Sequence, residues 1–344
     1  MIVRMMIPCM LWVLTRDPAC GQVPKTHYDP TQIVGPGECA RCHSVEELAW
    51  QKTHHFQTFR TLPSSAEAEE IADRMDIFDV TEESACLQCH FTVQQTSPTE
   101  DATAISGISC ELCHGAAKNW IEVHNDLGDW ENDKTAEPAE HKAARLKPAA
   151  EKGMNQLSSV VSFVSNCYGC HTVPNEKLVN VGEHPAGSDF EIVSWSQGEV
   201  RHNFLESETK NRPSSSSHLQ LLYITGKALN LEYGLRGIAE ATEKGPYATA
   251  MQKRIEEAGQ DLRTIADANT GKEPLQLAEL DTILELIPKT FPLGERDTYL
   301  TLAAKIREAV LALEANHKSY GKELDKLTPL IPTADQWKGP VFRK

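Results

Sequence analysis

The chain of 344 residues is long enough for one large domain or two of ordinary size, and 40% hydrophobic with 24% charged residues is typical of a soluble globular protein. Its formal net charge of −15 argues against nucleic acid or an anionic membrane as a partner. No run of roughly 18 apolar residues occurs, which argues against an ordinary membrane-spanning helix.

The N-terminal segment, residues 1–21, has the features of an export signal. Arg4 precedes an apolar run over residues 5–14, and small residues near Ala19 offer a cleavage region. Cys20 leaves a lipoprotein signal open, although the residues before it are a poor lead-in for lipidation. We therefore expect an exported, periplasmic protein of the bacterial type.

Eight of the ten cysteines form four pairs of one pattern, CxxC followed at once by histidine. The four motifs are Cys39, Cys42 and His43; Cys86, Cys89 and His90; Cys110, Cys113 and His114; and Cys167, Cys170 and His171. A lone CxxC also fits a zinc half-site or a redox dithiol, but neither explains a histidine after all four pairs. CxxCH is the attachment site of c-type haem, whose vinyl groups bind the thiols and whose iron binds the histidine. The sequence therefore predicts four haem c groups.

The spacing of the motifs predicts one shared haem core. The first cysteines lie 47, 24 and 57 residues apart, which is too little chain to bury each haem in its own domain. We therefore expect the four macrocycles to pack close together, as rapid electron transfer requires. This also explains why aromatic residues make up only 6% of the chain.

The segment after the first motif carries a candidate for a second axial ligand. Apolar residues at spacings of three and four over residues 45–59 predict an amphipathic helix. His55 lies twelve residues past His43, about 18 Å along such a helix, and therefore cannot bind the same haem. If His55 is a ligand, it serves another haem. His54 points elsewhere and is the weaker candidate.

Three further histidines are candidates for axial positions. His124 lies ten residues past His114, and the same distance argument favours a haem other than that of the third motif. After the fourth motif, His202 lies in an apolar segment and is the first choice, while His184 precedes a proline in a loop and is the second. The other histidines, His27, His141, His218 and His317, are expected at the surface.

The C-terminal region changes character after a Pro- and Ser-rich linker at residues 211–218. Helical periodicity predicts four helices, at about 218–242, 246–268, 274–287 and 295–317. The simplest interpretation is a bundle that covers the haem core, and the alternative is a docking or homodimer surface. The expected fold class is all-α: a multihaem core with little regular sheet over residues 22–210 and a helical extension over 211–344.

Over about residues 35–204 the chain resembles the tetrahaem cytochrome c-554 family, electron carriers found beside hydroxylamine oxidoreductase. The resemblance rests on Trp50 and His55 after the first motif, on "GISCELCHG" followed by His124, and on the order of the motifs. It implies that the haem of the second motif has an open position and that the other three have two histidine ligands.

The resemblance also implies which histidine serves which haem. His55 is implied for the haem of the third motif, His124 for the first and His202 for the fourth. This chain departs from the family by offering His184, which could close the open site. The resemblance says nothing of the C-terminal extension over residues 211–344.

These features predict a periplasmic electron carrier with mostly bis-histidine haems of low potential, and a redox partner with a basic docking surface. The main alternative is a multihaem enzyme that acts on nitric oxide, nitrite or hydroxylamine at a five-coordinate haem. No motif has the lysine that replaces histidine in multihaem nitrite reductases, and we assign no catalytic residue. A structural or haem-storage module is a third alternative.

Overall fold

The computed structural model describes residues 28–344 apart from 98, 132, 134, 135, 188, 205–208 and 269–274. Within this part of the chain helices dominate, and the strands β1 (Thr92–Gln94) and β2 (Thr103–Ser106) form one antiparallel pair. The predicted all-α class with little regular sheet is therefore confirmed. The predicted export signal and Cys20 lie outside the described residues.

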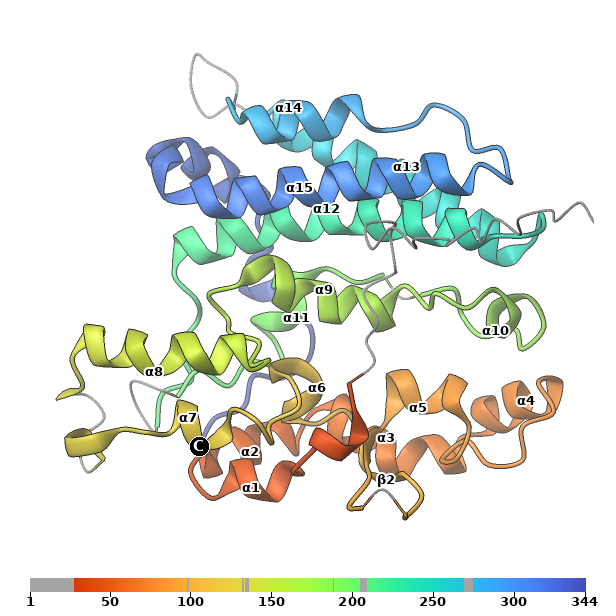
Figure 1. Cartoon of the computed structure of the whole chain (residues 1–344). Coiled ribbons are helices and arrows are strands. Elements are labelled where there is room, and N and C mark those ends of the chain that lie inside the picture. The colour runs from red at the N-terminus through yellow and green to blue at the C-terminus, as the bar shows by residue number, and fades with distance from the viewer. Residues whose placement is uncertain are drawn as a thin grey trace, which may run out of the picture.

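Short helices make up the half of the molecule that carries the CxxCH motifs (Figure 1). They are α1 (Pro36–Ala40), α2 (Ser44–Trp50), α3 (His54–Thr61), α4 (Ala66–Arg74), α5 (Ser84–His90), α6 (Cys110–His114) and α7 (Ile121–His124). They are followed by α8 (Ala139–Glu151), α9 (Val160–His171), α10 (Glu176–Asn180) and α11 (Ile192–Ser196). Figure 1 shows α9 and α11 between these helices and the C-terminal bundle.

The single helix predicted over residues 45–59 is wrong, because α2 and α3 are separate helices. Thr53 begins α3: its side chain accepts a hydrogen bond from the backbone N–H of Phe56 at 3.2 Å, which is an N-cap. The same hydroxyl donates to the carbonyl of Trp50 at 2.7 Å, which fixes the turn between the two helices. The path from His43 to His55 is therefore bent.

The C-terminal bundle consists of α12 (Ser216–Glu240), α13 (Pro246–Ala266), α14 (Ala278–Glu285) and α15 (Arg296–Tyr320). All four helices lie where the sequence predicts them, with ends shifted by a few residues. The helix α12 is buried on all sides, as expected of a central element. At Gly234 a Cβ would meet Ile255 at 2.8 Å, so glycine lets α13 approach α12 closely.

One hydrophobic core joins the bundle to the haem-motif half. It contains Val161, Val164 and Tyr168 of α9 together with residues of α12 to α15. The division into domains at residue 211 stays a prediction, as does a homodimer through the helices. Among the described residues, no helix combines the length and the apolar character needed to cross a bilayer.

The C-terminal tail leaves the bundle and returns to the haem-motif half (Figure 1). Phe342 packs against Phe204 at a ring-centre distance of 6.1 Å and joins the small apolar cluster of Val45 and Ala49. The tail therefore holds the segment that carries His202 against α2.

Candidate haem sites

Each CxxCH motif lies on or beside a short helix. The helices α5 and α9 end at His90 and His171, α6 spans the third motif, and His43 precedes α2. A helical turn places residues three apart on one side of the helix, so both thiols of a motif face the same way. None of the eight motif cysteines is in a disulfide.

The motifs face one continuous cavity of about 1780 Å³. It is larger than the 300–1,000 Å³ typical of a site for one small ligand. All eight motif cysteines and all four motif histidines line it, and so do six further histidines: His54, His55, His124, His184, His202 and His218. The predicted site residues are thus brought together around a single space.

The histidines lie in four pairs, each with one motif histidine and one histidine from elsewhere. The ring centres are 6.3 Å apart for His43 and His124, and 6.2 Å apart for His55 and His171, His90 and His184, and His114 and His202. An imidazole nitrogen binds a first-row transition metal at about 2 Å, so two rings on opposite sides of one iron have centres about 6 Å apart. All four pairs have this separation.

In three of the non-motif histidines, a hydrogen bond between Nδ1 and a backbone carbonyl fixes the orientation of the ring. The distance from Nδ1 to the carbonyl oxygen is 2.5 Å for His124 and Ile121, 2.7 Å for His202 and Val200, and 2.8 Å for His184 and Pro185. An N–H at Nδ1 that donates to a carbonyl leaves the lone pair on Nε2, and metal-binding histidines are commonly held in this way.

Burial keeps several of these imidazoles neutral. It lowers the pKa of His90, His114 and His171 to about 4, and it also lowers the pKa of His55 and His124. Neutral imidazole is the form that binds a metal. These rings are therefore ready to act as ligands at pH 7.

The amino-acid sequence of the motif region has known relatives. Residues 38–115, which contain the first three motifs, match the family model described as cytochrome c554 and c-prime. The chain is also 26% identical over 148 residues to cytochrome c-554 of Nitrosomonas europaea, which covers 40% of this chain and 56% of that protein. The motif region is thus similar to the cytochrome c-554 family. No solved structure is detectably similar to the chain.

The similarity to the cytochrome c-554 family implies c-type haem with iron, and the residues present fit that group. Three cavity-lining side chains have buried N–H groups without a hydrogen-bond partner: Nε1 of Trp120 and of Trp195, and Nε and Nη1 of Arg201. Buried donors without an acceptor cost free energy, and the propionate groups of haem would supply acceptors. In the described part of the chain, no cluster of three or more His, Cys, Asp or Glu side chains could hold a metal ion directly.

The histidine pairs differ from those that the resemblance to the cytochrome c-554 family implies. His124 lies opposite His43, as implied. His55, however, lies opposite His171 of the fourth motif and not opposite His114. The bend at Thr53 accounts for this, because it directs α3 away from the line of α2 and towards α9.

The other two pairs change accordingly. His202 lies opposite His114 of the third motif and not opposite His171, because the C-terminal tail holds its segment beside α2. His184 lies opposite His90, so the position expected to be open beside the second motif has an imidazole on each side.

The remaining histidines are in no such pair. The ring of His54 is 84% exposed and its Nδ1 lies 2.7 Å from Glu199. His141 packs on Trp130 and pairs with Glu137 at 2.8 Å. His218 and His317 are on α12 and α15, and His27 lies outside the described residues.

Thiol contacts place the motifs in a spatial order that differs from their order in the sequence. The side chain of Cys39 in the first motif lies beside that of Cys110 in the third. The side chain of Cys170 in the fourth motif lies beside that of Cys89 in the second, and its Sγ is 3.9 Å from the carbonyl oxygen of Gln88. The third and fourth motifs are joined by Asn166, whose side-chain nitrogen donates to the carbonyl of Cys113 at 3.2 Å. The order in space is therefore first, third, fourth, second. Sequence spacing alone carried no signal for it.

Proposed function

We propose that this chain is a periplasmic electron-transfer protein that holds four c-type haems, each between two histidines. Bound haem c supplies a one-electron couple whose potential depends on its axial ligands. The protein supplies eight thiols for attachment and eight imidazoles for the four irons. The observation that supports this most directly is the set of four histidine pairs at 6.2–6.3 Å.

The close spacing of the motifs supports transfer between the haems. Neighbouring motifs in the series first, third, fourth, second are in side-chain or backbone contact. An array of this kind would carry single electrons across the molecule between two partners. The net charge of −15 favours a basic docking surface on the partner, so the association rate should fall steeply with ionic strength.

The enzyme alternative needs an iron position that a substrate can reach. His184 lies opposite His90 with its ring fixed by the carbonyl of Pro185, which argues against an open second haem. We therefore favour the carrier over an enzyme that acts on nitric oxide, nitrite or hydroxylamine. Export is supported by the signal-like segment at residues 1–21.

Haem content and spin state test the proposal. Mass spectrometry and a haem assay of the exported protein should give four covalent haems, and electron paramagnetic resonance of the oxidised protein should show low-spin iron only. A high-spin iron that binds nitric oxide or cyanide would instead support the enzyme.

The variant His124→Ala tests the assignment of one ligand. We expect the haem content to stay at four while one low-spin signal becomes high-spin, because only the side chain opposite His43 is removed. An unchanged low-spin spectrum would show that His124 is not a ligand.

A further inference from the structure

The helix α9 is the motif helix most closely joined to the C-terminal bundle. Val160, Val161, Val164 and Tyr168 are buried on it and belong to the same core as α12 and α15. The fourth motif ends this helix at His171. The bundle therefore forms much of the surroundings of the fourth motif.

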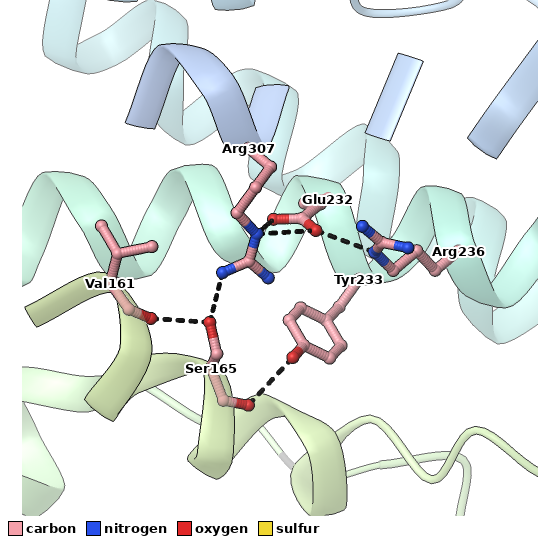
Figure 2. Close-up of polar contacts among 6 residues, drawn as sticks. All are labelled: Val161, Ser165, Glu232, Tyr233, Arg236 and Arg307. Atoms are coloured by element: carbon pink, nitrogen blue, oxygen red, sulfur yellow. Dashed lines mark hydrogen bonds and ion pairs between the residues drawn. The ribbon is translucent and has the colours of Figure 1, made fainter. Parts of the chain in front are cut away.

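Buried charged groups lie at this junction (Figure 2). Glu232 of α12 is fully buried and pairs with Arg236 and with Arg307 of α15, each at 2.8 Å. Arg307 also donates to the side-chain oxygen of Ser165 on α9, and the hydroxyl of Tyr233 donates to the Ser165 carbonyl at 3.0 Å. Within this cluster, one carboxylate between two guanidinium groups leaves a net charge of +1. A second carboxylate, that of Glu314 on α15, accepts a hydrogen bond from the backbone N–H of Val161 at 3.1 Å, at the end of α9 away from His171.

A further positive charge reaches the other end of α9. Arg254 of α13 donates to the side-chain oxygen of Asn230 at 2.5 Å and to the carbonyl of His171 at 3.5 Å. The carbonyl and amide oxygens that it binds are neutral. Asp189 and Glu257 also lie near Arg254 and offset part of its charge, while the guanidinium itself contacts the end of α9 that carries His171.

Packed aromatic rings, two pairs stacked and one edge-to-face, fill the space between the cluster and the motif histidine. Ring centres are 5.9 Å apart for Tyr233 and Tyr168, 5.3 Å for Tyr168 and Phe190, and 4.2 Å for Phe190 and His171. Tyr233, Tyr168 and Phe190 are each at most 9% exposed. A water-poor interior screens charge weakly, so the guanidinium groups act on the end of α9 over this distance.

The second motif has the opposite surroundings. Its helix α5 begins at the carboxylate of Glu83, which accepts a hydrogen bond from the N–H of Ala85 at 3.4 Å. The carboxylate of Glu83 thus lies at the start of the helix that carries the second motif, whereas guanidinium groups contact the helix that carries the fourth.

We propose that the buried arginines of the C-terminal bundle, Arg236, Arg254 and Arg307, raise the reduction potential of the haem carried by α9 above that of the haem carried by α5. This rests on the proposed function, since it assumes that both motifs carry haem. Reduction adds one negative charge to a haem, so nearby positive charge favours the reduced state. In a partly reduced protein, an electron would then occupy the haem of the fourth motif in preference to that of the second.

Redox titration of the holoprotein with single-charge variants tests this. Arg307→Gln should lower one midpoint potential, and Glu232→Gln should raise the same one. At a fixed applied potential, each variant should change the ratio of oxidised to reduced haem by at least about threefold. Arg307→Lys keeps the charge and should stay close to the wild type. Arg254→Gln leaves the ion pairs of Glu232 intact and should also lower that midpoint if the cluster variants fail to fold.

The control is Arg296→Gln, on the same helix as Arg307. Arg296 is half-exposed and pairs with Glu240 at 2.8 Å, so its loss should leave all midpoints unchanged. In a His55→Ala background the haem of the fourth motif becomes the high-spin one, which identifies the midpoint that moves. Shifts of Glu232→Gln and Arg307→Gln in the same direction, or no shift in either, would overturn the proposal. Fewer than four haems in the wild type would count against the proposed function instead.

Discussion

At the scale of single residues, His184 is held opposite His90 by the loop around it. Glu183 before it has a φ of 58°, in the left-handed region that a non-glycine residue seldom adopts. The backbone N–H of His184 donates to the carbonyl of Leu178 at 3.1 Å, and Arg74 pairs with Glu183 at 3.3 Å. These contacts fix the backbone of the loop, and the carbonyl of Pro185 fixes the ring of His184 at 2.8 Å, so this histidine is suited to be a ligand.

We expect His184→Ala to convert one of four low-spin haems to high spin and to create a site for cyanide or nitric oxide. Removal of this imidazole leaves His90 as the only histidine of its pair. Visible and electron paramagnetic resonance spectra measure the change. His54→Ala is the matched control, because that ring is exposed and in no pair, and it should leave four low-spin haems. Four low-spin haems in His184→Ala would contradict the assignment.

The motif residues could be predicted from the sequence because CxxCH is a local pattern. Which non-motif histidine lies opposite each motif histidine could not be predicted in this way. His55 and His202 were expected to serve the third and fourth motifs, and the structure exchanges them. Such pairs join residues more than 80 positions apart in the sequence, so nothing in the local spacing determines them.

At the scale of elements, amphipathic periodicity predicted the long helices of the bundle well and the short helices poorly. The apolar pattern over residues 45–59 continues across the turn at Thr53, which is 3% exposed and caps α3. A capping hydroxyl can interrupt a helix without interrupting the apolar stripe, because both helices pack on the same cavity. The interruption is what brings His55 to α9.

The helix α8 supports His124 through ion pairs whose strength depends on pH. Arg145 binds the carboxylate of Glu137 and donates to the carbonyl of His124. The hydrogen bond from Arg145 lowers the pKa of Glu137 to about 2, from 4.5. The ionised form is therefore favoured by folding, and its contribution is complete above pH 4.5 and disappears as the pH falls through about 2.

We therefore expect Glu137→Gln to be less stable than the wild type at pH 7, with a difference that shrinks towards zero as the pH is lowered to about 2. Denaturant unfolding followed by circular dichroism between pH 7 and pH 2 measures it. Glu140→Gln changes an exposed carboxylate on the same helix and should show no such trend. A stability difference that does not vary with pH would rule out the ion pair as its source.

At the scale of the whole molecule, the chain beyond the family match surrounds the haem sites on two sides. The bundle packs against α9, and the tail after it returns to the segment of His202. Lys338 pairs its backbone with Ser194 at 3.0 Å and with Glu199 at 2.8 Å, and Arg201 lies over the ring of Trp337 at 5.0 Å. The sequence predicted a bundle that covers the core. It did not predict the contacts of the tail, because these join single residues and follow no periodic pattern.

Removal of residues 333–344 should therefore loosen the segment of His202. We expect the haem of the third motif to become partly high-spin, and the free energy of unfolding to fall by at least about 2 kcal/mol through the loss of the Trp337 and Phe342 contacts. Absorption spectra and thermal unfolding measure the two effects. Removal of Arg343 and Lys344 alone is the control, since both are exposed. If the longer truncation lowers stability but keeps four low-spin haems, the tail stabilises the fold without positioning His202.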